Sequence, residues 1–196
     1  MFLVAGLGNP GEQYMNTPHN LGFRIVEVLA ARHSVRLNRK DSKALAGVGE
    51  IAGCPVMLAQ PQTYMNLSGT SVAPLVRKHE IPLEQLIVVY DELDLPWGSL
   101  RIRPRGSAAG NHGVESLIHH LGTAEFARVR VGIHPGHAVR DGAEFVLAPF
   151  KRSQEKELEE VLGRAADAVE SIIAEGVEKS MTKFNRRAGG VHNEEA

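Results

Sequence analysis

The first 22 residues constrain the fold more than any other stretch of the chain. The apolar run FLVA at 2–5 is followed at once by GLGNPG at 6–11, whose glycines and proline interrupt regular structure. Apolar residues with helical spacing begin at Leu21. This order predicts a buried strand, a long loop and then a helix, and ligand sites in open α/β sheets usually lie at such strand ends.

The glycine pattern does not fit a dinucleotide site. The fingerprint G-x-G-x-x-G opens a helix directly and is followed by an acidic residue about 20 positions later. Here Pro10 and a long loop separate the glycines from the helix. The sequence therefore argues against nucleotide binding at this loop.

Helical and strand-like segments alternate through most of the remaining chain. LIVVY at 86–90 is an uninterrupted, β-branched run, typical of a central strand. The other expected elements are helices over 21–32, 114–121, 153–175 and 177–184, a helix through Val72, Leu75 and Val76, a hairpin of 44–51 and 55–60, and strands over 99–103 and 129–133. We predict a single-domain three-layer α/β/α fold over residues 1–188, with a twisted, mixed, mostly parallel sheet. Residues 189–196 are expected to form a flexible tail.

Charge and cysteine content narrow the class of protein. The net charge is -1, and Cys54 is the single cysteine, so an internal disulfide is excluded. No run approaches the roughly 18 apolar residues of a membrane span, and no signal peptide is recognisable, so we expect a soluble, cytoplasmic protein. Six arginines and two acids lie between Trp97 and Arg140. This stretch is either a phosphate-binding face or a solvated surface.

Side chains suited to hydrolysis lie at strand ends and in loops. They are Asn9, His19, Asn20, Asn66, Asp91 and the pair Asn111–His112. Asp91 follows the 86–90 strand, so it either caps a turn or accepts a hydrogen bond from an imidazole. A histidine base with such a partner activates water, and amide N–H groups stabilise a carbonyl or its oxyanion. Hydrolysis of an ester or amide without a cofactor or metal is one hypothesis, and a ligand-binding α/β domain is the other.

Several long motifs resemble bacterial peptidyl-tRNA hydrolases. They are GLGNPG-x2-Y-x2-T-x-H-N-x-G at 6–22, TYMNLSG at 63–69, YDELDLPWG at 90–98, RVRVGI at 128–133 and FVLAPF at 145–150. The resemblance spans nearly the whole chain. It implies a monomeric α/β enzyme that needs no cofactor and hydrolyses the ester joining a peptide to the 3′ end of tRNA.

The resemblance also implies roles for the polar residues of the matched motifs. His19 would be the catalytic base and Asp91 its orienting partner. Asn9 and Asn66 would hold the substrate and the attacking water.

Three further residues of these motifs have two interpretations each. Tyr14 matches a tyrosine near the mouth of the family's site, where it either supports the substrate or packs. Met65 matches the apolar wall of the peptide groove, although a core methionine gives the same pattern. Asn20 is expected to cap the first helix rather than to touch substrate.

The same resemblance implies that the basic strand binds a phosphate of tRNA. Arg101 and Arg130 match positions where the family binds the 5′ phosphate of tRNA, and Arg103 lies on the same strand face as Arg101. Such contacts position a nucleic acid without reading its bases, so binding should be sensitive to salt.

One loop departs from the family's pattern. The family usually has His-Asn-Gly followed by an apolar and a basic residue, whereas this chain has Asn111-His112-Gly113 and Glu115. His112 aligns with the position of the family's substrate-binding asparagine, whereas Asn111 supplies the same kind of side chain one residue earlier. Both remain candidate substrate-binding residues. The alternatives to the enzyme are a relative of the same fold that binds RNA without catalysis and a generic esterase.

Overall fold

The fold is a seven-stranded mixed sheet in the order β2-β3-β4-β1-β5-β7-β6. The computed structural model describes residues 1–185, so the expected tail at 189–196 and residues 186–188 of the expected domain lie outside it. The pairs β1–β4, β1–β5 and β5–β7 are parallel, and the pairs β2–β3, β3–β4 and β6–β7 are antiparallel. Within the described residues, β3 and β6 therefore run against the other strands, as expected for a mixed, mostly parallel sheet.

The predicted elements appear in the expected order, together with short elements that were not predicted. The strands are β1 (Phe2–Gly6), β2 (Arg39–Asp41), β3 (Ala44–Ile51), β4 (Cys54–Pro61), β5 (Leu86–Pro96), β6 (Leu100–Arg103) and β7 (Ala127–His134). The α-helices are α1 (Leu21–Arg32), α2 (Gly69–Lys78), α3 (His112–Leu121), α4 (Gly142–Leu147), α5 (Glu155–Glu175) and α6 (Val177–Phe184). Short 3-10 helices η1 (Glu12–Tyr14), η2 (Pro18–Asn20) and η3 (Met65–Leu67) lie near the ends of β1 and β4.

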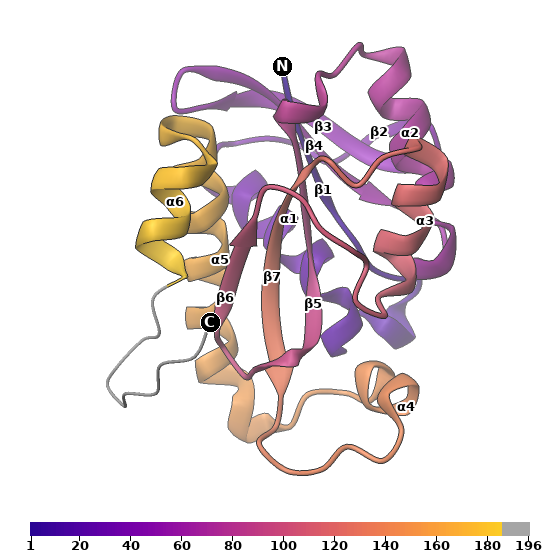
Figure 1. The fold of residues 1–196 in the computed structure, drawn as a ribbon, viewed down its shortest axis with the longest axis vertical. Helices are drawn as coiled ribbons and strands as arrows, with labels where there is room; N and C mark the ends of the chain where they lie inside the picture. The colour runs from indigo at the N-terminus through magenta and orange to yellow at the C-terminus, as the bar shows by residue number, and fades with distance from the viewer. Residues whose placement is uncertain (186–196) are drawn as a thin grey trace.

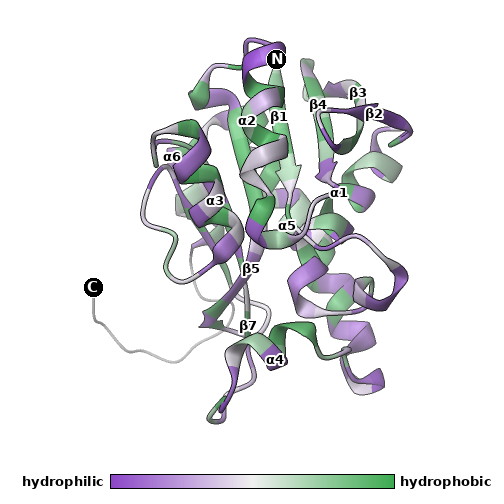
Figure 2. Ribbon diagram, turned by 90° about the vertical axis from the view of Figure 1, so that its right-hand side faces the viewer, coloured by the Kyte–Doolittle hydropathy of each residue, from purple (hydrophilic) through white to green (hydrophobic). Residues whose placement is uncertain are grey.

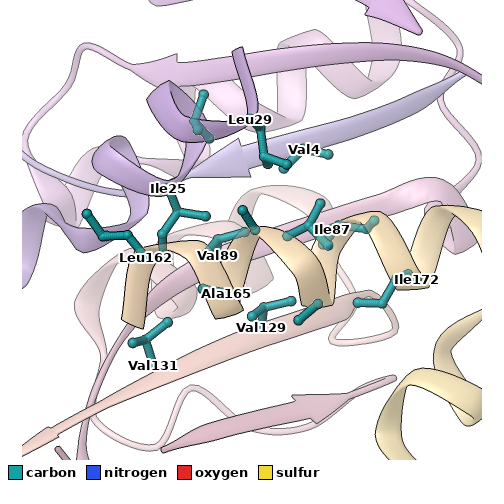
Figure 3. Close-up of a cluster of buried hydrophobic side chains, with 14 of the residues drawn as sticks. Val4, Ile25, Leu29, Ile87, Val89, Val129, Val131, Leu162, Ala165 and Ile172 are labelled. Carbon is teal, nitrogen blue, oxygen red and sulfur yellow. The ribbon is translucent and has the colours of Figure 1, made fainter. Parts of the chain in front are cut away.

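Both faces of the sheet are buried, which makes three layers. Val4 on β1 and Val89 on β5 pack with Ile25 of α1 and Ala165 of α5 on one face (Figure 3). Their strand neighbours, such as Val88, pack on the other face against α2 and α3. The ribbon of β1 is accordingly green along its length, and the edge strand β2 is purple (Figure 2). The predicted three-layer α/β/α arrangement is confirmed (Figure 1).

Two glycines bring the end of β1 against the start of α1. A Cβ atom on Gly6 would lie 2.1 Å from the carbonyl oxygen of Gly22, and one on Gly22 would lie 2.4 Å from the Val89 oxygen. Any larger side chain at either position would clash with backbone. The segment that joins β1 to α1 therefore starts and ends beside β5, and the polar residues gather there.

Several element bounds differ from the predicted ones, and three differences bear on the site. The β5 strand continues beyond Tyr90 to Pro96, because it pairs with β7 through Glu92 and, after a register shift, again at Pro96. The α3 helix begins at His112 rather than 114, since Asn111 caps it. The short helix α4 was not predicted, and Figure 1 shows it at the end of the sheet opposite the N-terminus.

A buried carboxylate ties β2 to the end of α2. The Asp41 side chain is 4% exposed and accepts hydrogen bonds from Ser42 Oγ, Lys78 Nζ and His79 Nε2 at 2.8–2.9 Å. Burial alone would raise the pKa of Asp41, but the hydrogen bonds outweigh it and lower the pKa to about 2.

Within residues 1–185, no helix combines the length and apolarity needed to cross a bilayer.

Candidate active site

A histidine and an aspartate form the centre of the site. His19 on η2 places Nδ1 at 3.0 and 2.9 Å from Asp91 Oδ1 and Oδ2 on β5. The two side chains are 13% and 2% exposed, respectively. Burial lowers the pKa of His19, but the charge and hydrogen bond of Asp91 outweigh it, so the pKa is raised above its ordinary value. Because Asp91 accepts from Nδ1, the neutral ring keeps its free lone pair on Nε2.

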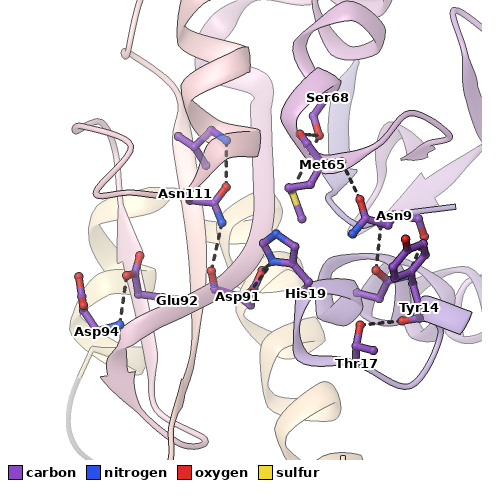
Figure 4. Close-up of polar contacts among 12 residues, drawn as sticks. Asn9, Tyr14, Thr17, His19, Met65, Ser68, Asp91, Glu92, Asp94 and Asn111 are labelled. Carbon is purple, nitrogen blue, oxygen red and sulfur yellow. Dashed lines mark hydrogen bonds and ion pairs between the residues drawn. The ribbon is translucent and has the colours of Figure 1, made fainter. Parts of the chain in front are cut away.

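The Asn9 side chain presents a hydrogen-bond donor next to this pair. Its Oδ1 accepts a hydrogen bond of 2.7 Å from the backbone N–H of Met65 on η3. This contact fixes the amide so that Nδ2 faces the space between Met65 and His19 (Figure 4). Asn9 Nδ2 donates to no residue within 1–185, so it is available to a ligand.

Asn20 does not cap α1 as expected. It occupies the residue before the helix, but its side chain makes no capping hydrogen bond. Its Oδ1 instead accepts from the backbone N–H of Asn9, and its Nδ2 donates to the carbonyl oxygen of Asn9, both at 2.9 Å. Tertiary contact with the loop after β1 has replaced the local cap.

These groups line a pocket of about 530 Å³. It lies between the ends of β1 and β5, η3, α4 and the start of α3. The lining residues are Asn9, Tyr14, His19, Tyr64, Met65, Asn66, Asp91, Glu92, Leu93, Asp94, Ala109, Gly110, Asn111, His112, Gly142, Ala143, Val146 and Leu147. All eight residues that the sequence predicted as catalytic or substrate-binding are therefore in one pocket.

The predicted substrate-binding residues differ in how firmly they are held. Met65 is 4% exposed and belongs to the core beneath the pocket as well as to its wall, so both interpretations of this residue apply. Tyr14 is half-buried on η1. Asn66 is exposed, and its side chain makes no hydrogen bond within residues 1–185. It borders the pocket as an exposed amide, in contrast to the anchored Asn9.

Asn111 and His112, the exchanged pair at the start of α3, lie in different environments. Asn111 is half-buried: its Oδ1 accepts from the N–H of Val114 at 3.0 Å, and its Nδ2 lies 3.4 Å from the carbonyl oxygen of Asp91. The His112 side chain is 74% exposed, with Nδ1 3.6 Å from Glu115 Oε2. Asn111 thus faces Asp91, while His112 lies at the rim.

Both the sequence and the fold match one family of known proteins. The peptidyl-tRNA hydrolase family model matches residues 3–192. The chain belongs to the peptidyl-tRNA hydrolase family. It is 66% identical to the peptidyl-tRNA hydrolase of Solibacter usitatus over 100% of both chains, and 50% identical to that of Koribacter versatilis over 95% of this chain and 94% of the relative. The crystal structure of the Acinetobacter baumannii peptidyl-tRNA hydrolase superposes with a TM-score of 0.86 at 34% identity, covering 94% of each chain.

The arginines that the family resemblance singled out lie together on β6 and β7. Arg101 is paired with Arg130, and Arg103 with Arg128, so all four side chains start from one face of the sheet. Arg130 is 19% exposed, and two of its nitrogens contact Glu92 Oε2 at 3.1 and 3.0 Å. Arg101 and Arg103 are half-buried.

Arg128 does not belong to a basic surface. It is 1% exposed, its guanidinium lies 4.3 Å from the centre of the Phe126 ring, and it donates to the carbonyl oxygens of Gly106, Ser107 and Ala124. Counting arginines along the sequence therefore overstated the exposed positive charge. The buried guanidinium anchors the loop that leads to Asn111.

Other members of the pocket were missed in the sequence. Tyr64 is 56% exposed and directly precedes Met65 at the pocket mouth. Val146 and Leu147 on α4 form an apolar wall, with Leu147 41% exposed. The available signal for Tyr64 was an aromatic residue directly before Met65 in the matched motif TYMNLSG. For α4 the signal was Asp141 three residues before Glu144, since Asp141 Oδ1 accepts from the Glu144 N–H as a helix cap.

Proposed function

We propose that this protein hydrolyses the ester bond between a peptide and the 3′ end of tRNA, releasing the peptide and a free tRNA. Membership of the peptidyl-tRNA hydrolase family supports this substrate. The observation that carries the proposal is the buried His19–Asp91 pair, which opens into a pocket with a fixed amide donor from Asn9.

In this mechanism His19 acts as a general base. Asp91 holds the proton on Nδ1, so Nε2 removes a proton from a water molecule as that water attacks the ester carbonyl. The resulting imidazolium is stabilised by the adjacent carboxylate. Collapse of the tetrahedral intermediate breaks the bond to the ribose oxygen, which takes the proton back from Nε2 as it leaves.

The amides hold the reacting carbonyl and the water. Asn9 Nδ2 is oriented by the Met65 N–H, so it donates to the carbonyl oxygen without first reorganising. Asn66 and Asn111 flank the same space and are assigned to the substrate and the attacking water. Between the exchanged pair, Asn111 is favoured because its Nδ2 lies at the Asp91 carbonyl, whereas His112 is mostly exposed.

The walls of the pocket suit the two halves of this substrate. Tyr64 offers an exposed ring at the mouth, and unpaired bases at the end of an RNA stack on such rings. Tyr14 lies at the same mouth. Met65 and the α4 side chains Val146 and Leu147 supply an apolar surface for the peptide.

Phosphate binding is assigned to the arginines of β6 and β7. Arg101, Arg103 and Arg130 lie on one face, and their contacts would position tRNA independently of its sequence. Glu92 already neutralises part of the charge of Arg130, so Arg130 contributes less to the salt dependence than a solvated arginine would. A monomeric state and a cytoplasmic location complete the proposal.

The test uses two substrates that share the same ester. One is a tRNA carrying an N-blocked, labelled peptide, and the other is the same peptide ester on adenosine alone. Release of peptide from the tRNA substrate, with far slower release from the adenosine ester, supports the proposal. Equal rates on both would indicate a generic esterase, and tight tRNA binding without release would indicate an RNA-binding relative.

A further inference from the structure

Asn20 is a buried polar residue that the mechanism does not use. It is 2% exposed, and it sits where a side-chain cap of α1 would be expected. Both atoms of its amide are instead committed to one neighbour: Oδ1 accepts from the Asn9 N–H, and Nδ2 donates to the Asn9 carbonyl oxygen, each at 2.9 Å. The η2 segment runs directly into α1, and the Leu21 N–H bonds to the Pro18 carbonyl oxygen, so the helix start does not depend on the Asn20 side chain.

The Asn20 contacts complete the restraint of Asn9. The backbone of Asn9 is held on both sides by Asn20, and its side-chain oxygen is held by the Met65 N–H at 2.7 Å. Three hydrogen bonds thus leave Nδ2 as the free polar group of this residue within the described chain. Gly8 contributes to the fit, because a Cβ atom there would lie 3.1 Å from Asn20 Cγ.

The contacts also connect Asn9 to the base. Asn20 directly follows His19 on η2, so its side chain ties the loop after β1 to the segment that carries the imidazole. The distance between the amide donor and the base is therefore set through two hydrogen bonds and one peptide unit. Catalysis is sensitive to such distances, since a displacement of about 1 Å costs on the order of 100-fold in rate.

We propose that Asn20 is a positioning residue that fixes the direction of the Asn9 Nδ2 donor relative to His19. The inference rests on the proposed function for its effect on rate, and on hydrogen bonding alone for its effect on Asn9. It assigns Asn20 no contact with substrate. A purely structural Asn20 would stabilise the fold without any special relation to Asn9.

Asn185 provides a matched control. Its side chain makes the same pair of hydrogen bonds to one backbone residue: Oδ1 accepts from the Ile102 N–H at 2.7 Å, and Nδ2 donates to the Ile102 carbonyl oxygen at 3.0 Å. It lies after α6 and does not line the pocket. Replacing either asparagine by serine removes a comparable backbone clamp, but only Asn20 is linked to Asn9.

The kinetic test is a double-mutant cycle on peptidyl-tRNA. Asn20→Ser should lower kcat by about 10- to 100-fold with little change in KM, and Asn185→Ser should keep kcat. In an Asn9→Ala background, Asn20→Ser should cost less than about threefold more, because the group that it positions is already gone. An equal loss in both backgrounds, or a loss matched by Asn185→Ser at equal folded fraction, would overturn the proposal.

Amide hydrogen exchange tests the same inference without relying on activity. In Asn20→Ser, the N–H of Asn9 should exchange faster, and so should the N–H of Met65, because the loosened Asn9 side chain no longer covers it. Asn185→Ser should leave both unchanged. If Met65 keeps its protection in Asn20→Ser, Asn20 does not orient the Asn9 side chain, whether or not the wild type hydrolyses peptidyl-tRNA. Inactivity of the wild type with loss of Met65 protection would refute the proposed function and leave the positioning role supported.

Discussion

Replacing Asp91 by asparagine separates the charge of this residue from its shape. The side chain is 2% exposed and has both oxygens within 3.0 Å of His19 Nδ1, so an amide of the same size fits the same space. The substitution removes the charge that stabilises the imidazolium. It also brings an N–H donor to Nδ1, which favours the tautomer with its proton on Nε2, where the base must be free.

The size of the effect follows from the geometry of the pair. Two unit charges about 4 Å apart interact with about 4 kcal/mol at an effective dielectric constant of about 20. The imidazolium forms only as the water is deprotonated, so most of this stabilisation belongs to the transition state. Because 1.36 kcal/mol is tenfold in rate, Asp91→Asn should lower kcat by about 10³-fold.

The pH profile gives a second, independent signature. His19 must be neutral to act as a base, so kcat/KM should rise with pH through the pKa of His19, which Asp91 raises above its ordinary value. In Asp91→Asn, burial still lowers this pKa and the opposing charge is gone. The acidic limb should therefore move to lower pH while the plateau falls.

The assay is single-turnover release of labelled peptide from peptidyl-tRNA between about pH 5 and pH 9. Asp167→Asn serves as the control, since Asp167 is 53% exposed and bonded to Arg32 away from the pocket. A fall of less than tenfold in Asp91→Asn, or an acidic limb at the wild-type pH, would refute the assignment of Asp91 as the partner of the base.

Substitutions at four other positions test separate parts of the account. Asp41→Asn should lower the free energy of unfolding by about 1 to 2 kcal/mol at neutral pH, as measured by urea denaturation. The difference from the wild type should vanish as the pH falls through 3.8 towards about 2, because the lowered pKa of Asp41 stabilises the fold only above that range. Tyr64→Ala should raise KM for peptidyl-tRNA by about tenfold while Tyr64→Phe stays near wild type, because stacking needs the ring and not the hydroxyl; equal losses in steady-state kinetics would exclude stacking. Asn111→Ala should reduce kcat/KM about 10-fold or more and His112→Ala by less than about threefold, and the reverse order would assign the substrate contact to the exposed His112.

Much of the fold could be predicted because its signals are local. The glycines and proline at 6–11 mark the end of β1, and the observed bounds of α1 and α6 coincide with the predicted ones. The run at 86–90 lies within the buried part of β5, which continues to Glu92. These elements are specified by the apolar spacing and by the residues that interrupt it.

Three of the errors share one cause, which is contact between residues distant in the sequence. The acids after Tyr90 read as the end of a strand, yet β5 continues because β7 pairs with it. Arg128 was predicted to belong to a basic surface, but the carbonyl groups of residues 106 and 107 and the Phe126 ring bury it. Asn20 carries the pattern of a cap, and its partner lies 11 residues earlier in the chain.

The site was predictable in outline and not in detail. A histidine, an aspartate and amides at strand ends indicated general-base chemistry, and the family resemblance named the substrate. The sequence could not show that Asn9 is anchored while Asn66 is exposed, or that Asn111 rather than His112 faces Asp91. Those distinctions depend on which backbone groups lie within reach, and the loops decide this only when folded.

The central claim is that His19 is the base of a hydrolase and not a tRNA contact. The most direct measurement compares peptide release and tRNA binding for the wild type and His19→Ala on the same peptidyl-tRNA. We predict that His19→Ala binds within about threefold of the wild-type affinity and loses release by at least 10²-fold, since general-base catalysis contributes about 10² to 10⁴. Release at near the wild-type rate by His19→Ala, or a wild type that binds tRNA and releases nothing, would contradict the account.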